Sequence, residues 1–462
     1  MSDTIAAIAT GGAISAIGII RISGTSALTA ADSVFRAACG IKLKDADNRR
    51  MYYGEISGSR GVCADDDALI DLCLCVISRS PTSYTGEDTV EFHCHGSPVV
   101  LSEIMRALLK NGVRQALPGE FTKRAFLNGR MDLTQAEAVI DLIEAETQSA
   151  AYNAAGQLRG AISIRMESVY DRLLDIMAHF HAVIDYPDED IDEFDMQNYL
   201  AVLRDAENEL RRMLETHERG KVLRDGIPTA IIGRPNTGKS SLLNALLGYE
   251  RAIVTDVAGT TRDTIEEKFL IGNVLLRLID TAGLRKTDDT IEKLGVERTL
   301  AALSGAGLVM LVLDGAEPLT CEDFDALHSI PPDVPKIAVV NKSDLPAALT
   351  SSQLAELGIE SCMVSALSGE GLDTLDVKIR KMFPEFGTTP SGELITNARQ
   401  AEAISNAAGS LSLAVSALAS SVTPDAVLTD IEAAISAIGE ITGKTMREDI
   451  ISRVFERFCV GK

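Results

Sequence analysis

The sequence predicts a multidomain chain of α/β and α class. We expect an N-terminal α+β domain, a central all-helical domain, and an α/β domain inserted into the helical one. Three observations lead to this expectation. The chain has 462 residues, which suggests two to four domains. A phosphate-binding loop lies in the middle, between a strand-like and a helical segment. Segments on both sides of this central region have helical periodicity.

The central loop is Gly-Arg-Pro-Asn-Thr-Gly-Lys-Ser at residues 233–240, which matches G-x-x-x-x-G-K-[ST]. An apolar run at 229–232 predicts a buried strand before it, and 241–247 predicts a helix after it. Backbone N–H groups and a helix dipole would then face an anion. Lys239 can reach the β- and γ-phosphates, and the Ser240 hydroxyl can hold Mg²⁺. An accidental loop match is the alternative, and the flanking segments argue against it.

Two further motifs predict that the nucleotide is GTP. Asp280-Thr281-Ala282-Gly283 ends the strand-like run 274–279, where an Asp can hold Mg²⁺ through water. Asn341-Lys342-Ser343-Asp344 follows a second strand-like run, 337–340, and resembles the N-K-x-D motif of GTPases. Its Asp can accept N1–H and the exocyclic amine of guanine, which adenine does not offer. Ser365-Ala366-Leu367 lies where such proteins usually have S-A-K.

The residue after the Asp-Thr-Ala-Gly motif is Leu284, which cannot orient a water molecule as the Gln of many small GTPases does. Ala258-Gly259-Thr260-Thr261-Arg262-Asp263 resembles the G-T-T-R-D switch of the TrmE–Era–EngA GTPases. In that group a potassium ion can replace the arginine finger. The resemblance implies potassium ligands at Asn236, Thr255, Val257 (through its backbone) and Thr260, with Thr261 on Mg²⁺ and Asp256 in the same nucleotide-binding loop. The alternative for Asn236 is that it only shapes the loop.

Composition limits the remaining possibilities. Asp and Glu outnumber Lys and Arg by 67 to 44, so the net charge is −23. Nonspecific nucleic-acid binding over the whole surface is therefore not expected. The eight Cys are scattered, which fits a reducing cytoplasm. We find no apolar run of about 18 residues, and Asp3 stands where a signal peptide would be positively charged. We therefore expect a cytoplasmic protein without a membrane span.

Residues 1–128 alternate between strand-like and helical stretches. We expect a helix at 27–38, strands at 69–77 and 89–94, and a helix at 99–110. His93 with His95 and Cys73 with Cys75 could suggest a metal site, but neither pair has the spacing of zinc modules. A buried strand that uses Cys as a small apolar residue is the preferred interpretation.

Several stretches of this domain resemble the N-terminal domain of the MnmE (TrmE) family of tRNA-modifying GTPases. They are Ile20-Arg21-Ile22-Ser23-Gly24, Ser83-Tyr84-Thr85-Gly86-Glu87-Asp88, Gly96 with Pro98, and residues 118–130 from Pro118 to Arg130. The resemblance implies a dimerisation domain that binds 5-formyl-tetrahydrofolate or a related tetrahydrofolate. It places folate contacts at Arg21, Glu91 and Arg130. For each of them the alternative is an ordinary surface ion pair.

Residues 129–219 predict helices, including an amphipathic helix at 133–143 capped by Asp132 or Thr134. A long pattern runs from Leu158 to Val183, and an acidic segment at 184–192 interrupts it. That segment is either a solvated connector or a Mg²⁺ or partner site. A single helix from Met196 to Arg219 follows. We therefore assign the helical domain to 129–219 plus 386–462 and the Ras-like G domain to 220–385.

The end of the chain supports the same family. After a linker at 387–392, an Ala- and Ser-rich helical segment ends in Phe458-Cys459-Val460-Gly461-Lys462, which resembles the family's F-C-I-G-K terminus. The resemblance covers essentially the whole chain. It implies that Lys462 contacts the folate and that Cys459 takes part in the modification. A packed or merely exposed thiol and a prenylation box are the other interpretations of Cys459.

The family also implies a catalytic residue. Residues 291–298, Ile-Glu-Lys-Leu-Gly-Val-Glu-Arg, resemble its V-E-x-x-G-I-E-R motif, whose first Glu, Glu292 here, is the catalytic carboxylate. An exposed Glu at a helix start is the alternative.

The function implied is that of a homodimeric, potassium-dependent GTPase that hydrolyses GTP as its G domains dimerise. It would modify C5 of the wobble uridine of tRNA with a tetrahydrofolate one-carbon unit. MnmG (GidA), an FAD protein, would be its partner in a heterotetramer or larger complex. One rival function is a ribosome-assembly GTPase switch, which predicts an RNA-binding module that we do not find. The other is a folate-binding scaffold with a vestigial GTPase, against which the intact nucleotide motifs argue.

Overall fold

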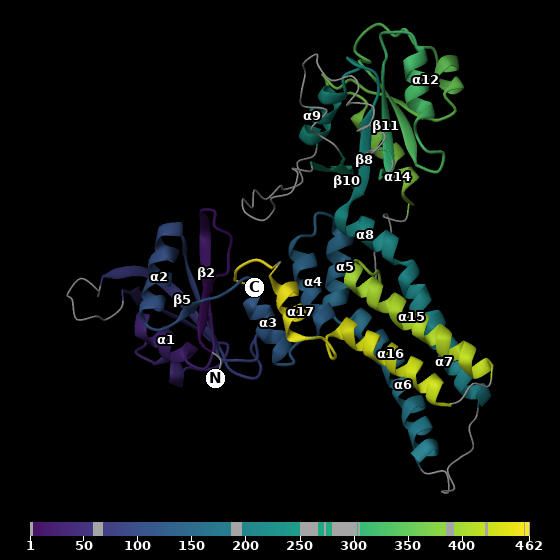
Figure 1. The fold of residues 1–462 in the computed structure, drawn as a ribbon. Coiled ribbons are helices and arrows are strands. Elements are labelled where there is room, and N and C mark those ends of the chain that lie inside the picture. Colours follow the sequence, from purple (N-terminus) through teal and green to yellow (C-terminus); the bar gives the residue numbers. More distant parts are fainter. Residues whose placement is uncertain are drawn as a thin grey trace. The chain divides into compact units, whose positions relative to one another are not determined.

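The structure is a computed structural model, and it describes residues 3–58, 68–185, 196–249, 267–271, 274–279, 303, 305–384, 392–420, 424–456 and 458–461. The chain forms two compact units. The first comprises residues 1–140, 162–195 and 417–462, and the second comprises 141–161 and 196–416. Each unit therefore combines segments that are far apart in the sequence. Figure 1 labels helices and strands of both units.

The first unit contains a seven-stranded sheet with the strand order β3-β4-β5-β6-β2-β1-β7. Neighbouring strands pair antiparallel except β1 and β7, which pair in parallel. The strands are β1 (Ile5–Ile8), β2 (Ser15–Ser23), β3 (Phe35–Ala37), β4 (Met51–Ser57), β5 (Leu69–Ser78), β6 (Thr89–Gly96) and β7 (Arg114–Gln115). The strands predicted at 69–77 and 89–94 are thus confirmed as β5 and β6.

Helices α1 (Ala27–Val34) and α2 (Pro98–Lys110) contribute to the apolar core of this sheet. The helix predicted at 99–110 is confirmed as α2. The helix predicted at 27–38 is wrong in its last turn, because Phe35–Ala37 forms β3 and pairs with β4. Phe35 and Ala37 are buried while Arg36 is exposed, which is the period of a strand. Pairing with β4 therefore overrides the local helical preference.

The rest of the first unit is helical. Its helices are α3 (Glu120–Leu127), α6 (Ala161–Asp185), α16 (Pro424–Thr442), α17 (Glu448–Phe455) and the larger part of α4 (Leu133–Ile143), and η1 (Leu43–Asp45) is a short 3₁₀ turn. α4 has the predicted bounds. Asp132 is its cap, because its Oδ1 accepts a hydrogen bond from the Gln135 N–H at 2.9 Å. Gln135 Oε1 accepts from the Asp132 N–H at 3.0 Å, which completes a capping box.

The second unit contains a six-stranded sheet with the order β13-β12-β11-β8-β10-β9, in which only β9 is antiparallel to its neighbour. The strands are β8 (Ile227–Ile232), β9 (Lys268–Ile271), β10 (Val274–Leu278), β11 (Leu308–Asp314), β12 (Lys336–Asn341) and β13 (Glu360–Met363). All seven residues of β11 are buried, as predicted for a parallel strand covered on both faces.

Helices cover both faces of this sheet. Alternate residues of its strands belong to two separate apolar cores, one with α9 (Lys239–Tyr249) and α14 (Leu372–Met382), the other with α12 (Cys321–His328) and α13 (Ser351–Glu356). The unit also holds α5 (Gln148–Leu158), α7 (Met196–Glu215), α8 (His217–Asp225) and nearly all of α15 (Ala398–Ala419). This layout is the doubly covered sheet on which P-loop proteins are built.

The single helix predicted from Met196 to Arg219 is wrong, because the structure has two helices separated at Thr216. Residues 395–396 pack closely against this break. Thr216 Oγ1 accepts a hydrogen bond from the Ile395 N–H at 3.1 Å, and a Cβ on Gly220 would lie 2.1 Å from the Ile395 carbonyl oxygen. Contact with a distant part of the chain thus decides where α7 ends. Among the described helices, none is both long and apolar enough to span a bilayer.

Candidate nucleotide-binding site and N-terminal polar site

The loop between β8 and α9 has the conformation of a phosphate-binding loop. Gly233 has φ +146°, and a Cβ there would lie 2.3 Å from the Val312 carbonyl oxygen. Gly238 has φ +90°, and a Cβ there would lie 2.2 Å from the Asn341 side-chain nitrogen. Both positions therefore require glycine. Asn236 has φ +64°, a left-handed conformation that Asn adopts more readily than most residues.

Lys239 points back into this loop. Its Nζ donates hydrogen bonds to the carbonyl oxygens of Gly233 at 2.8 Å and Arg234 at 2.7 Å. Burial lowers the pKa of Lys239 below its ordinary value. An anionic phosphate beside this ammonium group would stabilise its charged form. Backbone carbonyl groups of the loop thus hold the Lys239 ammonium group in the described part of the chain.

Asn341 joins the phosphate end of the site to the base end. Its Nδ2 donates to the Thr237 carbonyl oxygen at 3.0 Å, and its Oδ1 accepts from the Ala366 N–H at 3.0 Å. Asn341 is buried, so these bonds are protected from water. One side chain therefore connects the loop after β8 with the segment after β13.

The base end contains the other predicted guanine contacts. Ser365 is buried, and its Oγ donates to Asp344 Oδ1 at 2.6 Å, which orients that carboxylate. Lys342 has φ +64°, and its Nζ lies 2.6 Å from Asp314 Oδ2. Burial by itself would raise the pKa of Asp314, but the hydrogen bonds from Lys342 and the Ala316 N–H, together with the charges of Lys342 and Arg234, outweigh it and the pKa is lowered. Leu367, the departure from S-A-K, is 88% exposed.

The structure thus brings together the predicted nucleotide contacts Asn236, Thr237, Gly238, Lys239, Ser240, Ser241, Asn341, Lys342, Asp344, Ser365 and Ala366. The remaining predicted nucleotide and cation contacts, the predicted catalytic residue and one predicted folate contact lie outside the described residues. They are Thr255, Asp256, Val257, Ala258, Gly259, Thr260, Thr261, Asp280, Thr281, Ala282, Gly283, Glu292 and Lys462. Two of the predicted cation ligands are described. Asn236 has a left-handed backbone conformation, and Ser240 lies in the first turn of α9. Each carries a side-chain oxygen atom, the kind of ligand that hard cations such as Mg²⁺ prefer.

In the first unit, Arg21 and Glu91 face each other across β2 and β6. Arg21 Nε donates to Glu91 Oε1 at 2.7 Å, and the guanidinium carbon lies 5.4 Å from the Tyr84 ring centroid and 5.7 Å from that of Phe121. His93 Nε2 is 3.6 Å from Glu91 Oε2. The two predicted folate contacts therefore form an ion pair with each other, in which the Arg21 side chain is 16% exposed and that of Glu91 26%.

Arg130, the third predicted folate contact, is exposed. Its Cγ would lie 3.3 Å from a Cβ on Gly86, so its stem passes beside the loop that carries Tyr84. Tyr84 Oη is 2.9 Å from Thr122 Oγ1, and burial raises the pKa of Tyr84. Arg21 and Arg130 thus both adjoin the loop at residues 83–88.

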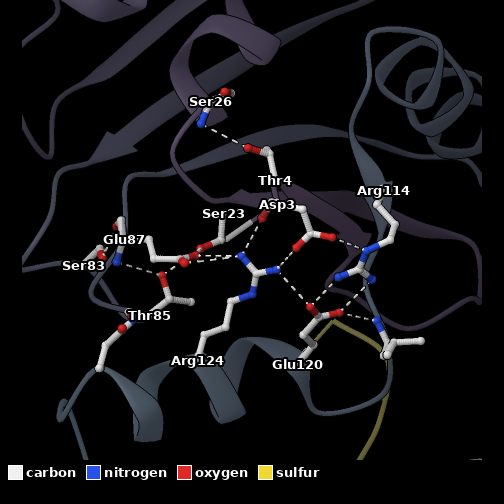
Figure 2. Close-up of polar contacts among 12 residues, drawn as sticks. Asp3, Thr4, Ser23, Ser26, Ser83, Thr85, Glu87, Arg114, Glu120 and Arg124 are labelled. Atoms are coloured by element: carbon white, nitrogen blue, oxygen red, sulfur yellow. Dashed lines mark hydrogen bonds and ion pairs between the residues drawn. The ribbon is translucent and has the colours of Figure 1, made fainter. Parts of the chain in front are cut away.

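A network of charged groups that the sequence did not predict holds this loop (Figure 2). Arg124 pairs with Glu87 at 3.0 Å, with Asp3 at 2.8 Å and with Glu120 at 2.9 Å. Arg114 pairs with Asp3 and with Glu120, each at 2.6 Å. Most of these residues lie in the motifs quoted above, which is the only sequence signal that pointed to them. Their pairing joins the N-terminus, the 83–88 loop, β7 and α3.

The end of the chain packs against the start of α3. The Gly119 N–H donates to the Cys459 carbonyl oxygen at 3.2 Å, and a Cβ on Gly119 would lie 2.6 Å from the Phe455 carbonyl oxygen. The ring centroids of Phe455 and Phe458 are 5.0 Å apart. Cys459 itself is exposed, so the structure agrees with an accessible thiol.

The metal interpretation of the N-terminal Cys and His residues receives no support. Cys73, Cys75 and Cys94 are buried in the apolar core, and burial raises the pKa of Cys75. His95 Nδ1 lies 2.7 Å from Asp71 Oδ1. Within the described ranges, no three potential ligands of the His, Cys, Asp or Glu type gather as a metal site would require. The prediction of a buried strand is confirmed.

Comparison with known proteins assigns both parts of the chain. The family model described as "GTP-binding protein TrmE N-terminus" matches residues 4–130, and the "MnmE helical domain" matches residues 133–459. Proteins named tRNA modification GTPase MnmE from Alkaliphilus metalliredigens and Heliobacterium modesticaldum are each 43% identical, over 100% of this chain and of each relative. Among solved structures, the G domain of the T. maritima FeoB iron transporter is 26% identical, covering 35% of this chain and 99% of that one with a TM-score of 0.26.

Proposed function

The chain belongs to the MnmE family of tRNA modification GTPases, and from this premise we propose that it is a potassium-dependent enzyme that modifies the wobble uridine of tRNA. As a member of the family it is a GTP hydrolase of tRNA modification. The observation that carries the nucleotide part is a pair of hydrogen bonds made by the Asn341 side chain, which donates to the Thr237 carbonyl oxygen in the phosphate-binding loop and accepts from the Ala366 N–H. This arrangement supports simultaneous recognition of phosphate and guanine by residues of the proposed G domain, 220–385.

The described residues suggest a division of roles. The N–H groups of the loop and Lys239 would bind the β- and γ-phosphates, and Asp344 would accept the guanine N–H groups. Ser240, with Thr261 and Asp280, would hold Mg²⁺, which supplies charge neutralisation when it is bound. Asn236, with Thr255, Val257 and Thr260, would hold K⁺. Glu292 would then orient the attacking water when two G domains close.

Potassium dependence has a direct test. We expect GTP hydrolysis by the purified chain to be at least about tenfold faster in potassium than in sodium at equal ionic strength, because K⁺ would offset negative charge that develops on the phosphates. Asn236→Ala should remove this difference, while Asn236→Asp should keep part of it. Steady-state phosphate release at saturating GTP measures the effect. Equal rates in the two salts would refute the potassium site and leave the GTPase assignment in place.

The N-terminal domain supports a folate proposal. We place 5-formyl-tetrahydrofolate or a related folate at Arg21, Glu91 and Arg130, with Lys462 at the end of the chain. A folate has a dianionic glutamate tail that suits arginine and a pterin edge whose N–H groups suit a carboxylate. The folate would supply the one-carbon unit, and MnmG (GidA) with its FAD would act with this chain on C5 of the uridine.

A homodimer through the N-terminal domain forms part of the same proposal. Met51 and Tyr53 of β4 and Leu72 and Leu74 of β5 are exposed. They alternate with the residues that face the α1 and α2 core, so they share the other face of the sheet. An exposed apolar face of this kind is typical of a surface that another protein covers. We propose that a second copy of the chain covers it.

The folate proposal predicts a selective loss of binding. Glu91→Gln should weaken binding of 5-formyl-tetrahydrofolate at least about tenfold, because a neutral amide accepts more weakly than a carboxylate. Isothermal titration calorimetry measures this affinity. Glu103→Gln, on the exposed side of α2, is the matched control and should bind as the wild type does. Unchanged affinity in Glu91→Gln would mean that Arg21 and Glu91 form only a structural pair.

A further inference from the structure

Arg234 is the second residue of the phosphate-binding loop, and its side chain pairs with two carboxylates beyond the loop. Its Nη1 lies 2.9 Å from Glu317 Oε2, and its Nε lies 3.3 Å from Asp323 Oδ1. The side chain is only 15% exposed. Both partners follow β11, and Asp323 lies in the first turn of α12. The loop thus has a side-chain connection to the neighbouring part of the domain.

Asp323 depends on this connection. It is 1% exposed, and its Oδ2 accepts hydrogen bonds from the N–H of Thr320 at 2.9 Å and from its Oγ1 at 3.0 Å, in the capping box of α12. Oδ1 has no hydrogen-bond partner in the described part of the chain and faces the Arg234 guanidinium. A buried carboxylate without a counter-charge is strongly destabilising. Arg234 supplies that charge.

The backbone of Arg234 also shapes the loop from inside. Its carbonyl oxygen accepts from Lys239 Nζ at 2.7 Å and from Thr237 Oγ1 at 3.1 Å. Asn236, two residues later, takes the left-handed conformation. Arg234 therefore has two roles. Its side chain pairs with Asp323 of α12, and its carbonyl group accepts the hydrogen bonds that close the loop.

The segment after β11 contacts the base end of the site through different residues. Asp314 pairs with Lys342, and the Gly315 N–H donates to the Asn341 carbonyl oxygen at 2.8 Å. Arg234 forms neither of these contacts, although its charge helps to lower the pKa of Asp314. A change at Arg234 should therefore affect the phosphate end of the site and leave guanine recognition intact.

We propose that Arg234 is a positioning residue for nucleotide phosphates, acting through its ion pairs with Asp323 and Glu317. The ion pairs hold the Arg234 carbonyl group in place. Because this group accepts hydrogen bonds from Lys239 and Thr237, they also set the directions of the loop N–H groups. This role goes beyond the proposed function, because it concerns neither the cations nor the folate. It requires the planar, forked guanidinium, since one side chain contacts two separate carboxylates.

The test compares affinity, base selectivity and stability. We expect Arg234→Met to weaken GDP binding about tenfold and to leave the preference for GDP over IDP unchanged. IDP lacks the exocyclic amine that Asp344 is placed to accept, so this ratio reports on the base end alone. Displacement of a fluorescent GDP analogue gives both affinities, at a temperature where circular dichroism shows each variant folded. Arg234→Lys keeps the charge and should bind GDP with intermediate affinity.

Two further variants separate positioning from stability. Arg234→Met/Asp323→Asn removes the uncompensated charge, so it should recover the thermal midpoint of Arg234→Met while GDP affinity stays low. Arg380→Met breaks an ion pair on α14, in which the Arg380 side chain is 50% exposed and that of Asp376 16%, and should leave GDP affinity unchanged. The proposal is overturned if Arg234→Met binds GDP as Arg380→Met does, or if GDP affinity recovers together with the midpoint. A fall in the GDP-to-IDP preference would also overturn it.

Discussion

Gly238→Ala is expected to weaken GTP binding by roughly 100- to 1000-fold, which corresponds to about 3–4 kcal/mol. The new Cβ would lie 2.2 Å from Asn341 Nδ2, at a residue with φ +90°. The left-handed conformation costs an alanine about 1–2 kcal/mol. Moving the buried Asn341 amide away also breaks hydrogen bonds worth about 1–3 kcal/mol in total. Displacement of a fluorescent GTP analogue measures the loss.

Gly248→Ala is the matched control for this substitution. Gly248 lies inside α9, in the same domain, and a Cβ there would meet nothing within 4 Å. Because Gly248 is the next-to-last residue of α9 and its added Cβ meets open space, this variant should keep the stability of the wild type and bind GTP normally. Equal binding by the two variants would show that the contact between Gly238 and Asn341 does not shape the site.

Arg124→Met is expected to destabilise the N-terminal part of the first unit by about 3–5 kcal/mol. The side chain of Arg124 is 9% exposed and pairs with Asp3, Glu87 and Glu120. Removing it leaves the largely buried carboxylates of Glu87 and Glu120 with less counter-charge. Hydrogen exchange followed by mass spectrometry should show the lower opening free energy in α3, β7 and the neighbouring strand β1, because Arg124 and Glu120 lie in α3, Arg114 lies in β7 and Asp3 lies just before β1.

The effect of Arg124→Met should decrease in acid. Hydrogen bonding to Arg114 lowers the pKa of Asp3 to about 2. Burial by itself would raise the pKa of Glu120, but hydrogen bonds from Arg114, the Leu117 N–H and Arg124 outweigh it and lower that pKa. Carboxylates of this kind stabilise the fold above their unfolded pKa of about 4 and lose that contribution as the pH falls through their folded pKa. The difference between variant and wild type should therefore narrow from pH 4 towards pH 2.

A surface arginine provides the control for Arg124. Arg106 pairs with Glu103 on α2, where both side chains are well exposed, so Arg106→Met should change stability by less than about 1 kcal/mol. If Arg124→Met exchanged as slowly as Arg106→Met at neutral pH, the network would not stabilise the N-terminal domain. The outcome also bears on the folate proposal, because Glu87 belongs to the loop that carries Tyr84.

The nucleotide site was predictable from the sequence because its motifs are contiguous. The loop at 233–240 takes its shape from glycines and from local hydrogen bonds to Gly233 and Arg234, and a run of eight residues contains all of them. Strand and helix patterns predicted β8, β10, β12 and α9 for the same reason. The proposed folate contacts came from resemblance alone, and the structure adds that Arg21 and Glu91 are paired.

The two wrong helix predictions concern segments whose structure depends on contacts with residues far away in the sequence. The helix predicted at 27–38 loses its last turn to pairing with β4, and the helix predicted at 196–219 breaks where residues 395–396 pack against it. Local pattern carries no information on a partner 20 or 180 residues away.

The sequence by itself determined the fold class, GTP as the nucleotide and the family, since local motifs carry each of them. The tertiary structure alone decided how charges pair. Arg124 meets Asp3 and Glu87, and Arg234 meets Asp323, through contacts between segments that no spacing rule relates. A buried charged group needs an oppositely charged group close to it in three dimensions, at whatever distance along the sequence. Folding alone brings such groups together.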